Sequence, residues 1–291
     1  MTTDPLVSVI VATYRRDSSL KGALESLANQ TYKNIEIILV DDNDDYGWNQ
    51  KVNPSVMFTV FQNHPNQGAA KARNRGIDEA HGEYLTFLDD DDLYLPEKIE
   101  NQLRKMQNHF ADFSLTDLYL YTQEEKLVGK RIHRHLDKNL DVYKLLEYHF
   151  KYHLTGTDTI MFRKNYLIET GKFPPIDIGD EFYLITEAIL HQGEFLYIPG
   201  CFVKAYVHKN EEGLSTSVKR IEGENVLFAY KKRFFGFISK KSQKYIKMRH
   251  YAVIAFIELK KRKYFKFLLN SIKSFLISPL SCIKLFINIK H

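Results

Sequence analysis

The chain has 291 residues, of which 44% are hydrophobic and 26% are charged, so it can bury a substantial core. Its two cysteines, Cys201 and Cys282, lie far apart and form no CxxC pair, which disfavours a disulfide framework and a structural zinc site. Disulfides are rare in reducing compartments, and the N-terminus carries no signal-peptide pattern. We therefore expect a cytoplasmic protein.

The net charge of +5 combines two regions of opposite sign. Residues 231–291 contain 16 Lys and Arg and a single acidic residue, Glu258. The preceding 230 residues contain 25 basic and 35 acidic residues. An acidic globular body with a strongly basic tail predicts a polyanionic partner, either a membrane surface or a nucleic acid.

Apolar β-branched runs alternate with helical apolar spacing along the first hundred residues. Strands are predicted at 7–12, 36–40, 56–61 and 84–88. Helices are predicted near residues 17–28 and 69–80, and a third, opened by Pro96, is expected to bury Ile99, Leu103, Met106 and Phe110. This order predicts an α/β fold, a mostly parallel sheet flanked by helices, which binds ligands at the carboxyl ends of its strands.

The second part of the chain is less regular. Further strands are predicted at 159–163, 195–198 and 202–207, and an apolar helix follows Asp180 and Glu181. The sequence contains neither a GxGxxG motif nor a Walker A loop, which disfavours nicotinamide-dependent enzymes and P-loop NTPases.

Four consecutive carboxylates, Asp89 to Asp92, follow the fourth predicted strand. Adjacent like charges repel one another, and a divalent cation such as Mg²⁺ or Mn²⁺ supplies the counter-charge that carboxylate oxygens prefer. The alternative is an acidic turn exposed to solvent. The pattern favours a metal site, because the sequence that flanks the four carboxylates resembles a nucleotide-binding region.

Several stretches resemble the inverting family 2 glycosyltransferases, which have a GT-A fold and use nucleotide-activated sugars. The matching stretches are 7–14, 27–32, 36–43, 66–77 and 82–96. Beyond Leu115 the resemblance is limited to 178–184 and 206–217, and the last 60 residues show none. It implies a catalytic domain over 1–230, with a nucleotide-sugar half to about 115 and an acceptor half over 116–230.

The resemblance implies a role for each matching residue of the nucleotide site. Asp42 would accept a hydrogen bond from the nucleobase, and Tyr14 would stack on its ring beside Ala12 and Thr13. Arg73 would contact a phosphate or the base. The alternatives are that Tyr14 is a core aromatic residue and that Arg73 is a solvated helix residue.

For the acidic run, the resemblance implies that Asp91 ligates the metal and that Asp90 lies near the ribose. The family's usual first aspartate matches Asp89, which leaves the assignment open by one residue. His208, just before a serine-rich segment, would reach the metal or the diphosphate, or would have a structural role.

Inverting transfer needs one carboxylate base on the face opposite the leaving group, and the resemblance implies that Asp180 or Glu181 supplies it. The family's common order at this point is Glu-Asp, whereas this chain has Asp-Glu. Both residues are therefore candidates, and we favour Asp180.

The basic tail, 231–291, is predicted to contain an amphipathic helix after the basic cluster 260–263, ended by Ser278-Pro279. Its apolar face would comprise Phe265, Leu268, Leu269, Ile272, Phe275 and Leu276. No run of 18 uncharged apolar residues exists, so a membrane-spanning helix is not expected. The tail would bind an anionic membrane surface, or else pack on the catalytic core or a second subunit as a homo-oligomer. Nucleic acid is disfavoured, because no recognition pattern accompanies the charge.

Together these features predict a metal-dependent enzyme, peripheral at the inner face of the cell membrane. It would transfer a hexose or N-acetylhexosamine from a nucleotide sugar to a hydroxyl of a lipid-linked glycan or polysaccharide precursor. The favoured donor is a UDP-sugar. Two alternatives stay open: a metal-dependent nucleotidyltransferase, and a catalytically silent scaffold associated with the membrane.

Overall fold

The computed structural model describes residues 4–44, 58–133, 136, 140–176, 179–207 and 217–288. The chain divides into two compact units, the first made of 1–138 and 154–208 and the second of 139–153 and 209–291. The boundary predicted at 230 falls inside one helix of the second unit, α7 (Ser217–Lys232). The division into a catalytic domain and a tail stays a prediction.

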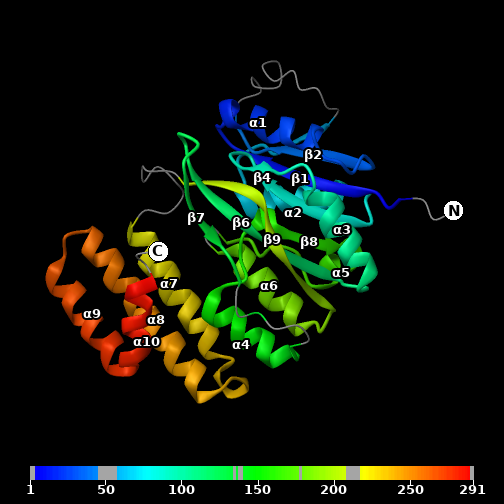
Figure 1. Ribbon diagram of the computed structural model, residues 1–291. Helices are drawn as coiled ribbons and strands as arrows, with labels where there is room; N and C mark the ends of the chain where they lie inside the picture. Colours follow the sequence, from blue (N-terminus) through cyan, green and yellow to red (C-terminus); the bar gives the residue numbers. More distant parts are fainter. Residues whose placement is uncertain are drawn as a thin grey trace. The chain divides into compact units, whose positions relative to one another are not determined.

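The first unit is built on one sheet, in which the described residues contribute nine strands in the order β3-β2-β1-β4-β8-β6-β9-β5, with β7 beside β6 (Figure 1). The early strands are β1 (Val7–Thr13), β2 (Ile35–Asp41), β3 (Thr59–Gln62) and β4 (Tyr84–Asp89). They pair in parallel, as predicted. The start of the third predicted strand, 56–57, lies outside the described residues.

The sheet is mixed beyond β4. Its later strands are β5 (Leu93–Tyr94), β6 (Phe113–Thr122), β7 (Leu127–Arg131), β8 (Ile160–Arg163) and β9 (Phe195–Val207). β8 pairs antiparallel with both β4 and β6, whereas β6 and β9 are parallel. The two strands predicted at 195–198 and 202–207 form the single strand β9, because a register shift against β6 accommodates the residues between them.

Helices cover both faces of the parallel half, and β1 is therefore buried on both sides. On one face, Val9 and Val11 pack in a core with residues of α1 (Asp17–Ala28) and α3 (Lys98–Asn108). On the other, α2 (Ala69–Glu79) packs directly on β1, since a Cβ at Gly76 would lie 2.5 Å from Ile10 Cγ2. Only glycine allows this close approach.

The predicted buried stripe of α3 is correct for Ile99, Leu103 and Met106 and wrong for Phe110. The helix ends at Asn108, and Phe110 follows it with a positive φ of 53° and an 80% exposed side chain. The change of backbone direction takes the residue off the helical face. The other short elements of this unit are η1 (Thr157–Thr159), α5 (Lys164–Glu169) and α6 (Asp180–Leu190).

The second unit is helical. Besides α7 it contains α4 (Val142–Tyr152), η2 (Phe235–Phe237), α8 (Lys240–Lys260), α9 (Tyr264–Ile277) and α10 (Pro279–Asn288). Glu147 of α4 accepts hydrogen bonds from Ser239 N and Ser242 Oγ at the start of α8, which joins the two helices. The predicted helix ending before Ser278-Pro279 is α9. No helix in the described part of the chain is both long and apolar enough to cross a bilayer.

Candidate active site

The carboxyl ends of β1, β2 and β4 lie next to one another in the sheet. Thr13 is aligned with Asp41, and Ala12 is aligned with Asp89, in the two parallel pairings that β1 makes. The predicted nucleotide-site residues of these strands are therefore neighbours at one edge, as the rule for parallel α/β sheets requires.

Asp42 is 3% exposed and holds the loop that leads into α2. Its Oδ2 accepts a hydrogen bond from Gly68 N at 2.7 Å, and its Oδ1 accepts from Gln67 N at 3.0 Å and Asn63 Nδ2 at 3.1 Å. Gly68 has a φ of 86°, which explains why glycine precedes the helix. A carboxylate has about four acceptor positions, so a further donor still has a place.

Tyr14 follows β1 and is 40% exposed, with the Arg15 guanidinium 4.9 Å from its ring centroid. The alternative that Tyr14 is a core aromatic residue is therefore wrong. The guanidinium lies over one face of the ring, which leaves the other face of this exposed tyrosine for a planar base at the carboxyl edge of the sheet.

Asp90 and Asp91 turn toward the end of β1. Asp90 Oδ2 accepts hydrogen bonds from Thr13 Oγ1 at 2.7 Å and from Tyr14 N at 3.3 Å. Burial raises the pKa of Asp90 to about 6, although the Thr13 hydrogen bond and the charge of Arg16 oppose the shift. Asp91 forms an ion pair with Arg16, whose Nε also lies 3.8 Å from Asp90. Arg16 thus supplies the positive charge for this pair of carboxylates.

Asp89 and Asp92 converge with a third carboxylate that no sequence pattern indicates, Asp158 of η1. One oxygen from each of the three lies within 4.8 Å of the others. Asp158 Oδ1 accepts from Asp89 N at 2.6 Å, and Asp92 Oδ1 accepts from Tyr206 N at 2.9 Å. Burial, followed by the charges of neighbouring carboxylates, raises the pKa of both Asp158 and Asp92, so that this pair holds a proton more readily than isolated aspartates do.

Asp158 reaches this cluster because β8 runs antiparallel to β4. Thr86 is aligned with Met161, so the residues that precede β8 lie beside the end of β4. In the sequence, Asp158 stands alone in a Gly-Thr-Asp-Thr stretch between regions of different pattern. The strand direction that gives it significance cannot be read from that stretch.

Behind the cluster lies a fully buried lysine, Lys98 of α3. Its Nζ is 2.9 Å from Tyr94 Oη and also donates to Thr86 Oγ1. Burial moves the pKa of Lys98 well below its ordinary value, against the opposing charge of Asp158. Lys98 therefore links Thr86 of β4 to Tyr94 of β5 and does not face solvent.

Arg73 of α2 joins the acidic strand end to α6. Its Nη2 is 2.7 Å from Asp89 Oδ1, and its Nη1 is 3.0 Å from Asp180 Oδ2. Only 11% of the Arg73 side chain is exposed. The alternative of a solvated helix residue is therefore wrong, and the structure brings Asp89, Arg73 and Asp180 together in one site.

Asp180 and Glu181 begin α6, after Gly179 in a left-handed conformation. Asp180 is buried and Glu181 is half-buried. Burial, and then the hydrogen bond to and charge of Asp180, raise the pKa of Glu181 to about 8. The other predicted site residue, His208, lies outside the described residues.

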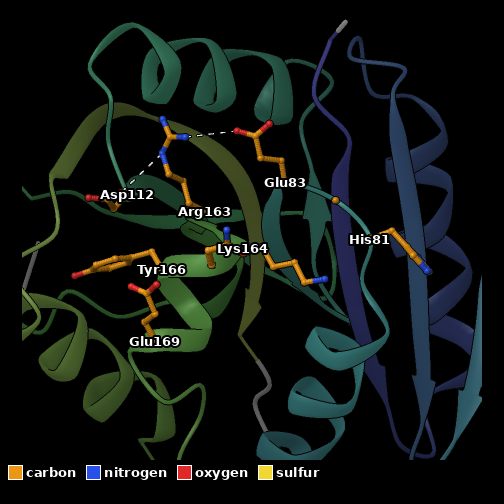
Figure 2. Close-up of a pocket in the computed structure, with 9 residues that line it drawn as sticks. His81, Glu83, Asp112, Arg163, Lys164, Tyr166 and Glu169 are labelled. Atoms are coloured by element: carbon orange, nitrogen blue, oxygen red, sulfur yellow. Dashed lines mark hydrogen bonds and ion pairs between the residues drawn. The ribbon is translucent and has the colours of Figure 1, made fainter.

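A separate open pocket of about 660 Å³ lies at the opposite edge, near the starts of β4 and β6 (Figure 2). Arg163 there is 3.5 Å from Glu83 and 3.8 Å from Asp112, the two pairs joined by dashed lines. Lys164 Nζ donates to Ala80 O. The basic residues Arg163 and Lys164 of this pocket are thus already paired with acceptors of the protein itself. The pocket lies at the opposite end of the strands from the carboxylates described above.

The fold resembles solved structures over most of the chain. Staphylococcus aureus TarS 1-349, solved in complex with UDP-GlcNAc, has a TM-score of 0.63 at 17% identity and covers 93% of this chain and 91% of that one. The mannosyltransferase PcManGT from Pyrobaculum calidifontis, in complex with GDP-Man and Mn²⁺, has a TM-score of 0.60 at 16% identity, over 99% and 80%. At such identities the likeness shows the fold alone, the GT-A fold.

The sequence shows the family. The profile of Glycosyl transferase family 2 matches residues 8–171, and the chain belongs to this family.

Two relatives illustrate the similarity. The chain is 39% identical over 118 residues to the UDP-Glc:alpha-D-GlcNAc-diphosphoundecaprenol beta-1,3-glucosyltransferase WfaP of Escherichia coli, covering 40% of this chain and 47% of WfaP. It is 33% identical over 135 residues to the putative teichuronic acid biosynthesis glycosyltransferase TuaG of Bacillus subtilis, covering 44% and 53%. The chain thus spans about half the length of these relatives.

Proposed function

We propose that this protein transfers a sugar from a nucleotide donor, a UDP-sugar, to a hydroxyl of a lipid-linked glycan or polysaccharide precursor, with inversion and with a divalent metal. The observation that carries the proposal is the Asp89–Arg73–Asp180 arrangement, which places the acidic strand end and the candidate base in one site. Family membership supports the class of reaction. UDP is supported by the donor in the name of WfaP.

The donor would lie across the carboxyl ends of β1, β2 and β4. Tyr14 would stack on the base, and Asp42 would accept its N–H at the remaining acceptor position. Asp90, held by Thr13 Oγ1 at 2.7 Å beside the end of β1, would lie nearest the ribose. The exposed ring of Tyr14 and the convergence of these three strand ends support this placement.

The residues present fit a hard divalent cation, Mn²⁺ or Mg²⁺, because one oxygen from each of Asp89, Asp92 and Asp158 lies within 4.8 Å of the others, and Asp91 stands between Asp89 and Asp92 in the sequence. Asp91, with Asp89 beside it, would hold the ion, and His208 would approach it as the resemblance implies. Asp92 and Asp158 bind the backbone N–H groups of Tyr206 and Asp89, which supports a role in fixing the shape of the site. A bound cation would neutralise the charge that develops on the leaving diphosphate.

The base would be supplied by the Asp180–Glu181 pair. Asp180 Oδ2 is occupied by Arg73, so an acceptor hydroxyl would have to displace a guanidinium to donate to that oxygen. Burial and the adjacent Asp180 raise the pKa of Glu181 above its ordinary value, toward the pH range in which a general base is most effective. These two features support Glu181 as the proton acceptor and Asp180 as the residue that orients it.

The acceptor would be a lipid-carried glycan at the cytoplasmic face of the membrane. The name of WfaP supports this, since its acceptor is a diphosphoundecaprenol-linked sugar. The basic helical unit would hold the enzyme at that surface.

The experiment is to incubate the full chain with Mn²⁺, a panel of nucleotide sugars and a lipid-linked acceptor, and to identify the products by mass spectrometry. We expect one nucleotide sugar to yield a nucleoside diphosphate and an extended glycan. Asp91→Ala and Glu181→Gln should each lower kcat by about 10²-fold or more. Release of pyrophosphate from a nucleoside triphosphate would instead identify a nucleotidyltransferase, and full cellular function of both variants would identify a silent scaffold.

A further inference from the structure

The last long helix of the second unit, α9, buries few apolar side chains: Phe267 and Ile277 are half-buried, and the other residues of its inward side are polar. Ser274 is fully buried and donates from Oγ to Met248 O of α8 at 2.9 Å. Ser271 Oγ is also buried, without a hydrogen-bond partner. Asn270 lies on the same side and is half-buried. A helix that only needed to join the core of this unit would bury its apolar side instead.

The apolar side of α9 is exposed. Phe265 and Leu276 are 80% and 73% exposed, and the side chains between them at helical spacing form one stripe. The stripe comprises Tyr264, Phe265, Leu268, Leu269, Ile272, Phe275 and Leu276, and Leu280 and Ile283 of α10 are exposed as well. An exposed apolar surface of this continuity marks a binding face.

The charges around the stripe are all positive. Basic residues precede α9 and accompany it: Lys260, Lys261, Arg262, Lys263, Lys266, Lys273 and Lys284. No acidic residue follows Glu258, which is itself buried. A second copy of the chain would bring two such basic surfaces together, and like charges oppose that association. Anionic phosphates beside hydrocarbon complement both the charge and the apolar stripe.

We propose that α9 is an in-plane docking helix for an anionic lipid bilayer, with its apolar stripe in the acyl region and its lysines at the phosphates. This deepens the proposed function, because it names the surface at which a lipid-linked acceptor is met. It stands on the packing of α9 and does not depend on the chemistry of the carboxylate site.

The test is flotation of the full chain with vesicles of phosphatidylcholine alone and of phosphatidylcholine mixed with phosphatidylglycerol. The wild type should float with the mixed vesicles, less with the neutral ones, and less at high salt. Phe265→Ser/Leu276→Ser should weaken binding to the mixed vesicles by about tenfold or more. The matched control is Phe110→Ser/Val226→Ser, since Phe110 and Val226 are 80% and 62% exposed elsewhere in the chain. The control should bind like the wild type.

Absence of wild-type binding, or equal binding by both double variants, would overturn the proposal. Sedimentation provides a second readout: a wild-type dimer that Phe265→Ser/Leu276→Ser dissociates would identify a second copy as the occupant and would also overturn it. Thermal melts of both variants show whether the fold is kept. Donor turnover with a water-soluble acceptor separates this inference from the proposed function, because a protein that fails to float can still release UDP.

Discussion

Arg73 and Asp180 form a buried ion pair, with 3.0 Å between Nη1 and Oδ2, although they are 107 positions apart in the chain. The same guanidinium binds Asp89 at 2.7 Å. One side chain of α2 therefore fixes the start of α6 against the end of β4. Arg73 is therefore the physical link between the acidic strand end and the candidate base.

Replacing Arg73 with Ala should destabilise the protein strongly. The substitution leaves two carboxylates in a largely buried site without their cation, and breaking a buried pair in this way costs about 3–5 kcal/mol. Urea unfolding of the wild type and of Arg73→Ala measures the loss as a lower transition midpoint.

The control for that prediction is a double-mutant cycle with Asp180→Ala. Removing both partners eliminates the unpaired charge at Asp180, so the double variant should lose less stability than the sum of the two single variants. Strictly additive losses would show that the ion pair contributes nothing to the fold.

Glu181→Gln should alter the pH dependence of stability. The pKa of Glu181 is about 8 in the folded protein and 4.5 ordinarily, so between these values the folded state binds more protons than the unfolded chain. The wild type should therefore lose stability as pH rises from 4.5 through 8, by up to about 1.4 kcal/mol per pH unit. Gln removes this loss, so Tm of the variant should exceed that of the wild type at pH 9 and approach it at pH 5.

The Glu181 experiment has a control variant and a result that would contradict it. Glu169→Gln, in the last turn of α5 and exposed, should leave the pH profile of Tm unchanged. A Tm difference between wild type and Glu181→Gln that is constant with pH would mean that the carboxyl group keeps its ordinary pKa in the fold.

Asp91→Asn and Asp158→Asn should have different effects on metal binding. If Asp91 ligates the ion and Asp158 holds the backbone of Asp89, Asp91→Asn should lose Mn²⁺ binding almost entirely, because it removes a ligand. Asp158→Asn should weaken Mn²⁺ binding by only about 10–100-fold, as expected for a residue that supports a ligand. It should also lower stability by about 1–3 kcal/mol, because it disturbs a buried hydrogen bond. Titration calorimetry with Mn²⁺ alone and thermal melts measure the two effects. The reverse result would place the ion among Asp89, Asp92 and Asp158.

Arg16→Gln should strengthen the binding of Mn²⁺ in the absence of nucleotide. Arg16 is the cation on Asp91 in this structure, and a metal at Asp91 has to displace it. Its loss should lower the Kd for Mn²⁺ by up to about tenfold. Arg15→Gln is the matched control, because Arg15 stacks on Tyr14 instead. Equal affinities of the two variants would show that Arg16 does not compete with the metal.

Much of the parallel half of the fold was predictable from sequence. β1, β2 and β4 are apolar runs buried on both faces, and α1 and α2 lie between them at the predicted places. Because parallel strands end at one edge, Asp42, Asp89 and Asp90 were expected to be neighbours without knowledge of any contact. The apolar positions of α9 were likewise readable from their helical spacing.

The tertiary structure decided what those residues touch. Asp158 enters the site only because β8 runs antiparallel to β4, and strand direction is set by packing rather than by local pattern. Arg73 finds Asp180 across a separation that no periodicity encodes. The spacing of α9 defines an apolar side, but only the burial of Ser274 shows that this side faces outward. Local sequence determines which side of each helix or strand is apolar. Long-range packing determines what that side contacts, because the free energy of burial depends on which surfaces the rest of the chain leaves uncovered.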